Sequence, residues 1–270
     1  MNIKKGDIVG RKSYGKDIFF VVDRILKSRL NKEFAILKGL NIRIMADSPT
    51  EDLEVISKKD ILNNIKSSNI EIEERIKKNK EVSNQLTRYK IYTGKILHLD
   101  GDRKYSEKSA RYYKKMGLNA VVKNIAENKQ SRVVIPLLNK YNPDILVITG
   151  HDAMLKNGRN YNNIYNYRNS RHFIETVKES RKWGKTSDKL VIFAGACQSF
   201  YEGIISAGAD FASSPGRILI DFVDPLIVAE KIALTEDYKF VSSYEISKEI
   251  KEGAKGVSGI GARGKSRIIG

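Results

Sequence analysis

Cys197 and His151 are the side chains whose chemistry could support nucleophilic catalysis. Cys197 is the only cysteine and lies in the segment GACQS, whereas His151 lies in GHDA. A free thiol is mostly protonated at neutral pH, but a nearby imidazole accepts its proton and leaves a nucleophilic thiolate. Backbone N–H groups around Gly195 would bind the developing oxyanion, and Gly150 and Gly195 would let a peptide backbone approach closely. A lone cysteine after an apolar strand is often a buried, inert residue, but together with His151 it predicts a thiol-dependent enzyme.

Each of these residues follows an apolar strand. Residues 145–149 (ILVIT) precede His151 and residues 190–196 (LVIFAGA) precede Cys197, with a predicted helix over 170–183 between them. A strand, a helix and a second strand of this kind form a right-handed crossover between parallel strands. Parallel strands end at one edge of their sheet, where open α/β sheets place their active sites. We therefore expect the thiol and the imidazole to lie side by side at that edge.

Apolar strands alternate with amphipathic helices throughout residues 91–252. Strands that are apolar on both faces are typical of parallel sheets covered by helices on each side. We therefore predict a doubly wound, mostly parallel α/β domain. Its further elements are expected at residues 95–99, 105–116, 120–125, 133–141, 200–207, 210–213 and 225–233.

The remaining regions differ in composition and in the pattern of their apolar residues. Residues 1–57 contain short apolar runs separated by turn residues, which predict a small SH3-like β-barrel. Residues 58–90 are charged and contain no proline or glycine, so we expect a stiff, exposed helical connector. Residues 253–270 are rich in glycine, lysine and arginine and are expected to form a flexible basic tail.

The spacing of the candidate pair resembles that of caspase-like cysteine peptidases, the clan CD type. Caspases carry Gln-Ala-Cys with a histidine about 50 residues upstream, and here His151 precedes Cys197 by 46 residues. The chain departs from that pattern at Asp152, because those enzymes usually have glycine directly after the histidine.

Seven segments in order resemble the YabG family of sporulation-specific proteases. They are KGDIVGRKSYGKDIFF, IRIMADSPTEDL, KILHLDGD, PDILVITGHDA, RNSRHFIETV, LVIFAGACQS and GADFASSPGR. The resemblance implies a cysteine endopeptidase with Cys197 and His151 as catalytic residues. It also implies synthesis in the cytoplasm of the mother cell, later association with the spore coat, and processing of spore coat and germination proteins. Cleavage after arginine and self-processing (autoproteolysis) are further implications.

Cleavage after arginine would require an acidic side chain in the pocket that receives the arginine, because a carboxylate pairs well with a guanidinium. The candidates for that acid are Asp152, Asp210, Asp221 and Asp224. Asp100 and Asp102 follow another predicted strand and lie at the same edge, so a role in substrate binding is open for them as well.

Three other features have competing interpretations. His172, near the start of a predicted helix, could line the site or replace His151 as the base, although such a residue is more often a surface histidine. The polar loop 154–168 is either a lid or self-cleavage site, or an ordinary solvated loop. His98 lies within a predicted strand and is expected in the core.

Charge leaves two alternatives to proteolysis. The net charge of +17 could attract nucleic acid, anionic lipid or acidic protein surfaces. However, the basic residues are spread along the whole chain, which is typical of a solvated lysine-rich surface. We therefore expect protein substrates rather than nucleic acid. A nucleic-acid-binding protein and a non-catalytic spore coat scaffold remain the alternatives.

Cofactors and membrane contact are not expected. The three histidines and one cysteine lack the spacing of metal ligands, and no glycine-rich phosphate loop follows a strand. A single cysteine excludes an internal disulfide. The N-terminal segment lacks the apolar region of a secretory signal, and no stretch approaches the ~20 apolar residues of a spanning helix. We therefore expect a cytoplasmic protein.

Overall fold

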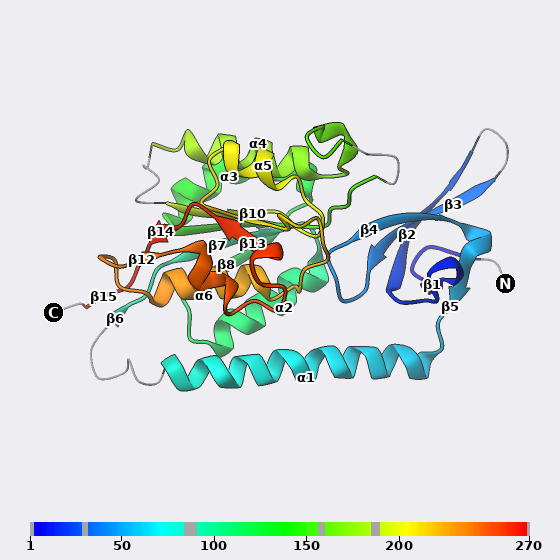
Figure 1. The fold of residues 1–270 in the computed structure, drawn as a ribbon, viewed down its shortest axis with the longest axis horizontal. Coiled ribbons are helices and arrows are strands. Elements are labelled where there is room, and N and C mark those ends of the chain that lie inside the picture. The colour runs from blue at the N-terminus through cyan, green and yellow to red at the C-terminus, as the bar shows by residue number, and fades with distance from the viewer. Residues whose placement is uncertain (1–2, 29–31, 84–90, 156–159, 185–189, 269–270) are drawn as a thin grey trace.

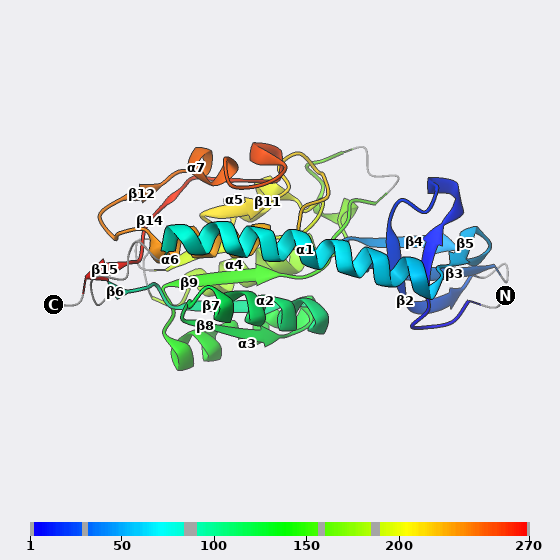
Figure 2. The same cartoon turned by 90° about the horizontal axis from the view of Figure 1, so that it is seen from below.

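Two bodies connected by a long helix form the molecule (Figure 1). The structure is a computed structural model, and it describes residues 3–28, 32–83, 91–155, 160–184 and 190–268. The N-terminal body is a β-sheet and the larger body is an α/β domain. Helix α1 (Lys58–Ser83) leaves the sheet and runs along the α/β domain, as the second view shows (Figure 2).

A six-stranded sheet lies at the centre of the α/β domain. Its order is β13-β11-β10-β9-β7-β8, in which the strands from β11 to β8 are parallel and β13 is antiparallel. The strands are β7 (Ile96–Asp100), β8 (Ala120–Asn124), β9 (Ile145–Thr149), β10 (Val191–Ala194), β11 (Phe211–Ser213) and β13 (Val257–Gly259). Shorter strands are β6 (Ile91–Tyr92), β12 (Phe240–Val241), β14 (Ala262–Arg263) and β15 (Arg267–Ile268).

Helices cover both faces of this sheet, as predicted for a doubly wound domain. Successive side chains of a strand point to opposite faces, so Ile145 and Val147 pack in one core while Leu146 and Ile148 pack in the other. Helices α2 (Arg103–Lys115) and α6 (Asp224–Leu234) contribute to the first core. Helices α3 (Glu127–Tyr141), α4 (Ser170–Arg181) and α5 (Tyr201–Ser206) contribute to the second. A short helix, α7 (Ser243–Ser247), packs near α6 and β13.

The strand order reverses between β7 and β9. The chain passes from β7 to β8 at one edge and then crosses to β9 on the other side of β7. In open α/β sheets, ligands bind in the crevice beyond the carboxyl ends of the strands at such a switch point. Asp100 ends β7 and Gly150 follows β9, so these residues flank the crevice.

The N-terminal sheet is open, so the predicted SH3-like barrel is not confirmed. Its five antiparallel strands have the order β4-β3-β2-β1-β5, and β4 and β5 are its edges. One physical reason is that the start of β4 meets the α/β domain, where the Met45 N–H donates to the Asp152 carbonyl at 3.1 Å. The strands are β1 (Ile8–Arg11), β2 (Phe19–Lys27), β3 (Glu33–Gly39), β4 (Met45–Pro49) and β5 (Leu53–Val55).

Two further predictions concern the connector and the tail. Helix α1 occupies most of the predicted connector, whereas residues 84–90 lie outside the described residues. The flexible tail predicted for 253–270 is wrong over most of its length, since β13 pairs with β11 and β15 pairs with β6. These strands are too short and too polar to show an apolar pattern, and they are stabilised by partners far away in the chain. Single-turn 3-10 helices occupy Lys12–Tyr14, Thr50–Asp52, Ile164–Asn166 and Gly253–Lys255.

Candidate active site

The register of β9 and β10 brings the predicted catalytic pair to one edge of the sheet. Ile148 pairs with Ala194 in this parallel ladder, and His151 and Cys197 each lie three residues further on. The condition that the two strands are neighbours is therefore met. Both side chains are fully buried beyond the carboxyl ends of their strands.

Cys197 is held as a thiol in this arrangement. The Ile220 N–H donates to its sulfur at 3.4 Å, and the thiol donates to the Ile220 carbonyl at 3.7 Å. Burial raises the pKa of Cys197 to about 12, because a thiolate would lose its hydration there. The hydrogen bond from Ile220 and the nearby charge of Arg43 act in the opposite direction but do not outweigh burial.

His151 is held as a neutral imidazole. Burial lowers its pKa to about 4, and within the described part of the chain neither ring nitrogen has a hydrogen-bond partner. Its ring packs edge-on against Tyr105 at a centroid distance of 5.7 Å. Among the described residues no hydrogen bond joins the thiol to the imidazole, so formation of the ion pair requires a rearrangement.

Glu127, which the sequence analysis missed, lies beside His151. This first residue of α3 accepts a hydrogen bond from the His151 backbone N–H at 2.7 Å, and its Oε1 lies 4.0 Å from Nδ1. Gly101 and Gly150 leave room for it, since a Cβ at either glycine would lie within 2.4 Å of the Glu127 carboxylate. One sequence signal could have pointed to Glu127. It is the first residue of the helix after β8, and β8 ends at the same side of the sheet as β9 and β10.

The Asp152 side chain joins the loops that carry the candidate pair. Its carboxylate accepts the N–H groups of Ala153 at 2.9 Å and Asn169 at 2.8 Å, and the hydroxyls of Ser170 and Ser199. Burial raises its pKa to about 6, although these hydrogen bonds act in the opposite direction. Asp152 therefore has a structural role here, which argues against its predicted role as the acid that receives an arginine.

The Gly195 N–H is not available to an oxyanion. It donates to the Ile148 carbonyl at 3.0 Å, and the Ala196 N–H donates to the Ser199 hydroxyl at 2.9 Å. Gly195 instead supplies a turn, because its φ of 115° lies in a region that L side chains rarely adopt. In the segment GACQS this leaves the N–H of Cys197 as the candidate oxyanion donor.

Asp100 lies in the crevice and binds an arginine from the N-terminal body. The fully buried Arg43 precedes β4, and its Nη2 lies 2.7 Å from Asp100 Oδ2. Its Nη1 donates to the Phe222 carbonyl at 2.7 Å, and its guanidinium lies 4.9 Å from the Tyr105 ring centroid and 5.7 Å from that of Phe222. Burial alone would raise the pKa of Asp100, but the Arg43 charge helps to hold that pKa below its usual value. Asp100 was expected at this edge with an open role in substrate binding, whereas no sequence signal had pointed to Arg43.

Other predicted site residues have local roles. Asp102 caps α2 by accepting the backbone N–H groups of Lys104 and Tyr105. His172 lies on α4 with its Nδ1 3.6 Å from Glu175. His98 is in the core, as predicted, and its ring nitrogens contact the hydroxyls of Tyr113 and Thr149.

The other candidate acids lie in different surroundings. Asp210 precedes β11 and therefore lies at the amino ends of the parallel strands, away from the candidate pair. There it pairs with Arg181 at 2.7 Å. This placement argues against its predicted site role. Asp221 and Asp224 lie at the start of α6, where the Asp221 N–H donates to an Asp224 carboxylate oxygen at 3.1 Å. In the polar loop 154–168, the described ends pair with each other through a bridge between Met154 and Tyr167.

Comparison with known proteins identifies a peptidase family. The model of the family YabG peptidase U57 matches residues 4–269. The chain belongs to the YabG peptidase U57 family. It is 38% identical over 283 residues to the sporulation-specific protease YabG of Bacillus subtilis (strain 168), an alignment that covers 99% of this chain and 98% of that protein.

One solved structure shows a weak likeness. It is the receiver domain of the histidine kinase CKI1 from Arabidopsis thaliana, complexed with Mg²⁺. The match has 15% identity and a TM-score of 0.29, and it covers 44% of this chain and 80% of that one. A TM-score this low does not establish a common fold. Membership of the YabG peptidase U57 family therefore rests on the sequence.

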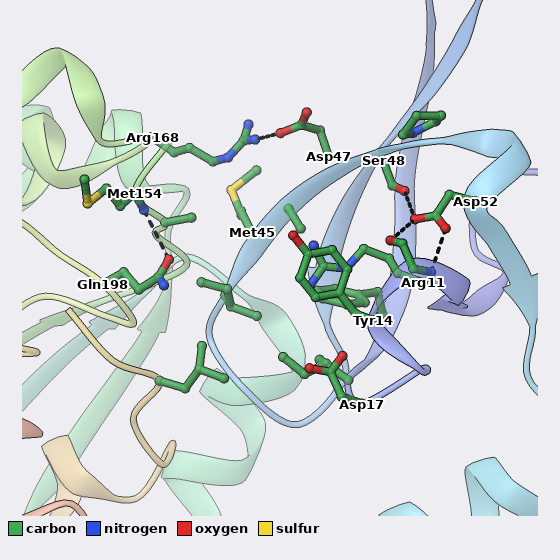
Figure 3. Close-up of a pocket in the computed structure, with 18 residues that line it drawn as sticks. Arg11, Tyr14, Asp17, Met45, Asp47, Ser48, Asp52, Met154, Arg168 and Gln198 are labelled. Atoms are coloured by element: carbon green, nitrogen blue, oxygen red, sulfur yellow. Dashed lines mark hydrogen bonds and ion pairs between the residues drawn. The ribbon is translucent and has the colours of Figure 1, made fainter. Parts of the chain in front are cut away.

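A peptidase needs a cleft that can receive a peptide, and one such cleft is lined in part by Gln198, the residue after Cys197. A cavity of about 610 Å³ lies between the N-terminal sheet and the α/β domain. Met45 and Asp47 line it from the sheet, whereas Met154, Arg168 and Gln198 line it from the other body (Figure 3). Arg168 pairs with Asp47 across the cleft. The cleft therefore ends beside Gln198, the neighbour of the buried cysteine.

Among the described residues, no group of three or more His, Cys, Asp or Glu side chains is arranged to hold a metal ion. None of the described helices combines the length and the apolar character needed to cross a membrane.

Proposed function

We propose that this member of the YabG peptidase U57 family is a cysteine endopeptidase in which Cys197 is the nucleophile and His151 the general base. The observation that carries the proposal is the β9–β10 register, which brings the only cysteine and a histidine with no hydrogen-bond partner among the described residues to the same edge of a parallel sheet. Family membership adds peptide-bond hydrolysis as the reaction.

The proposed reaction has two halves. His151 takes the Cys197 proton, and the thiolate adds to the carbonyl carbon of the substrate. The oxyanion receives hydrogen bonds from the N–H groups of Cys197 and Asp152. Collapse breaks the C–N bond as His151 protonates the leaving amine, and water then hydrolyses the thioester with His151 again as base. Glu127 positions the imidazole through the His151 backbone and nearby Nδ1.

Biological context completes the proposal. The relative in Bacillus subtilis is named a sporulation-specific protease, so we infer that this chain processes spore coat and germination proteins in the mother cell and becomes associated with the coat. Cleavage after arginine and self-processing belong to the same proposal. The pairing of Arg43 with Asp100 supports arginine recognition at this edge of the sheet.

A peptidyl-arginine chloromethylketone tests the catalytic assignment. The probe alkylates a nucleophile that has accepted an arginyl group into its site, so we expect mass mapping to place the label on Cys197. Cys197→Ala should retain its circular dichroism spectrum, lose the label and lose hydrolysis of an arginyl substrate. Full hydrolysis by Cys197→Ala would refute the proposal. Self-processing is measured by the intact mass of the wild type, which should show fragments that Cys197→Ala lacks.

A further inference from the structure

The pocket that holds Arg43 belongs to one body of the molecule, and the arginine belongs to the other. Asp100 ends β7, Tyr105 lies on α2 and Phe222 precedes α6, all within the α/β domain. Arg43 comes from the turn between β3 and β4 of the N-terminal sheet. A carboxylate, a carbonyl oxygen and two aromatic rings are the groups that recognise a planar guanidinium.

Asp100, the acid of this pocket, is oriented by other groups of the α/β domain. Its Oδ1 accepts the Asp102 N–H at 2.9 Å, and its Oδ2 accepts the Thr149 hydroxyl at 2.9 Å. Both Asp100 and Arg43 are completely buried. A buried ion pair contributes little net stability, because dehydration of the charges offsets their attraction. Such a pocket is therefore better explained by recognition of a guanidinium than by a need for stability.

The backbone around Arg43 is bound as an added strand. Ile44 forms a parallel bridge with Asp152. The Asp152 N–H donates to the Arg43 carbonyl at 3.3 Å, and the Met45 N–H donates to the Asp152 carbonyl at 3.1 Å. Peptides bind to sheet edges in this way, with main-chain hydrogen bonds supplying affinity and pockets supplying specificity. The Arg43 carbonyl is thus bound by the amide next to His151.

The same segment covers the cysteine. Ile44 packs in one buried cluster with Ala153, Cys197 and Ile220, and Cys197 has no exposed surface. A peptide presented from solution would need the space that this segment, residues 42–45, occupies.

We propose that Asp100, Tyr105 and Phe222 form the pocket for a substrate's arginine, and that Arg43 is its internal occupant, which excludes external substrates until residues 42–45 withdraw. The inference rests on the proposed cysteine peptidase activity. It assigns the acid that selects arginine, and it gives the N-terminal sheet an inhibitory role.

Hydrolysis of a fluorogenic peptidyl-arginine amide tests whether Arg43 blocks the arginine pocket. We expect full-length Arg43→Gln to hydrolyse it at least tenfold faster than the wild type. Arg43→Lys, which keeps a charge beside Asp100 and so protects the fold, should give a smaller rise. Arg24→Gln is the matched control, since Arg24 is an exposed arginine of the same sheet, and it should leave the rate unchanged. Wild-type rates in both Arg43 variants would overturn the inference.

A peptide in trans tests the recognition separately. The heptapeptide NIRIMAD, residues 41–47, should bind Cys197→Ala/Arg43→Gln in calorimetry and compete with the amide for Arg43→Gln. The same peptide with glutamine in place of arginine should do neither. Adding Asp100→Asn should abolish binding. Absence of heptapeptide binding to the folded double variant would show that the Arg43–Asp100 pair is only a contact between the two bodies.

Failure of the inference can be told apart from failure of the proposed function. Hydrolysis and labelling of Cys197 that do not depend on Arg43 would overturn the inference alone. The absence of both hydrolysis and labelling in every variant would overturn the peptidase proposal, and the inhibitory role would fall with it.

Discussion

At the scale of single residues, burial decides the chemical state of the candidate pair. A thiol whose pKa is about 12 and an imidazole whose pKa is about 4 do not exchange a proton at neutral pH. Both shifts arise from dehydration, so admission of water or of a polar substrate would reduce them. In the proposed enzyme the pair is therefore inactive while the site is covered, and it becomes competent when residues 42–45 leave.

Glu127 gives a test of how His151 is positioned. In Glu127→Gln we expect kcat/KM to fall about tenfold, since a lost contact to a charged group of roughly 1.5 kcal/mol corresponds to that factor. The pH profile should also change. A carboxylate stabilises imidazolium, so its removal lowers the pKa of the imidazolium and moves the alkaline limb to lower pH.

The control for this variant is Glu107→Gln. Glu107 is an exposed acid of α2 that pairs with Arg103, and its replacement should leave both the rate and the pH profile unchanged. If kcat/KM of Glu127→Gln fell about tenfold but its pH profile did not shift, Glu127 would have a structural role instead.

At the scale of elements, the C-terminal strands complete the sheet. Strand β13 pairs with β11 from Phe211 to Ser213 and covers an edge that would otherwise expose unpaired backbone groups. The pairing requires close approach at Gly259, where a Cβ would lie 2.1 Å from the Asp210 carbonyl oxygen and 2.8 Å from the Phe211 Cα. Glycine is therefore required at this position by its neighbours rather than by its φ.

Replacement of Gly259 should consequently destabilise the fold. We expect Gly259→Ala to lower the free energy of unfolding by about 1–3 kcal/mol, the usual cost of overpacking. Ser258→Ala, on the same strand opposite Ala212, should change it by less than about 0.5 kcal/mol. Urea denaturation of the two variants measures the difference. Equal stability would show that β13 contributes little to the sheet.

At the scale of the whole molecule, polar contacts beside the apolar cluster of Ile44, Ala153 and Cys197 hold the N-terminal sheet on the active edge. Lys104 Nζ donates to the Leu40 carbonyl at 2.7 Å, and the Tyr105 hydroxyl donates to the Gly39 carbonyl at 3.4 Å. Arg43 and Met45 supply the contacts nearest the site. Helix α1 keeps the sheet covalently attached if these contacts break. The arrangement therefore suits an element that can withdraw and return.

Lys104→Ala should loosen this contact without changing the arginine pocket. The lost hydrogen bond from a charged donor is worth roughly 1.5 kcal/mol, so we expect hydrolysis of the arginyl amide to rise up to about tenfold. Preference for arginine over lysine substrates should not change. Lys114→Ala, an exposed lysine on the same helix, serves as the control. An unchanged rate in Lys104→Ala, beside a raised rate in Arg43→Gln, would mean that Arg43 alone blocks the site.

The sequence by itself determined the parallel sheet and the candidate pair. The apolar run at Ile145–Thr149 coincides with β9, because a strand buried on both faces must be apolar at every position. His151 and Cys197 each closely follow an apolar strand, and this placement brings both residues to the carboxyl ends of the parallel strands. This inference needed only local patterns and the handedness rule for crossovers.

Only the tertiary structure decided what surrounds that pair. The open N-terminal sheet, the ordered β13 and the burial of Arg43 against Asp100 all depend on contacts between segments far apart in the chain. Local sequence does not encode such contacts, since an arginine that binds a distant carboxylate has the same neighbours as one that faces solvent. For the same reason Asp152 and Asp210 were not ranked as candidate acids from the sequence, although they have different surroundings in the fold.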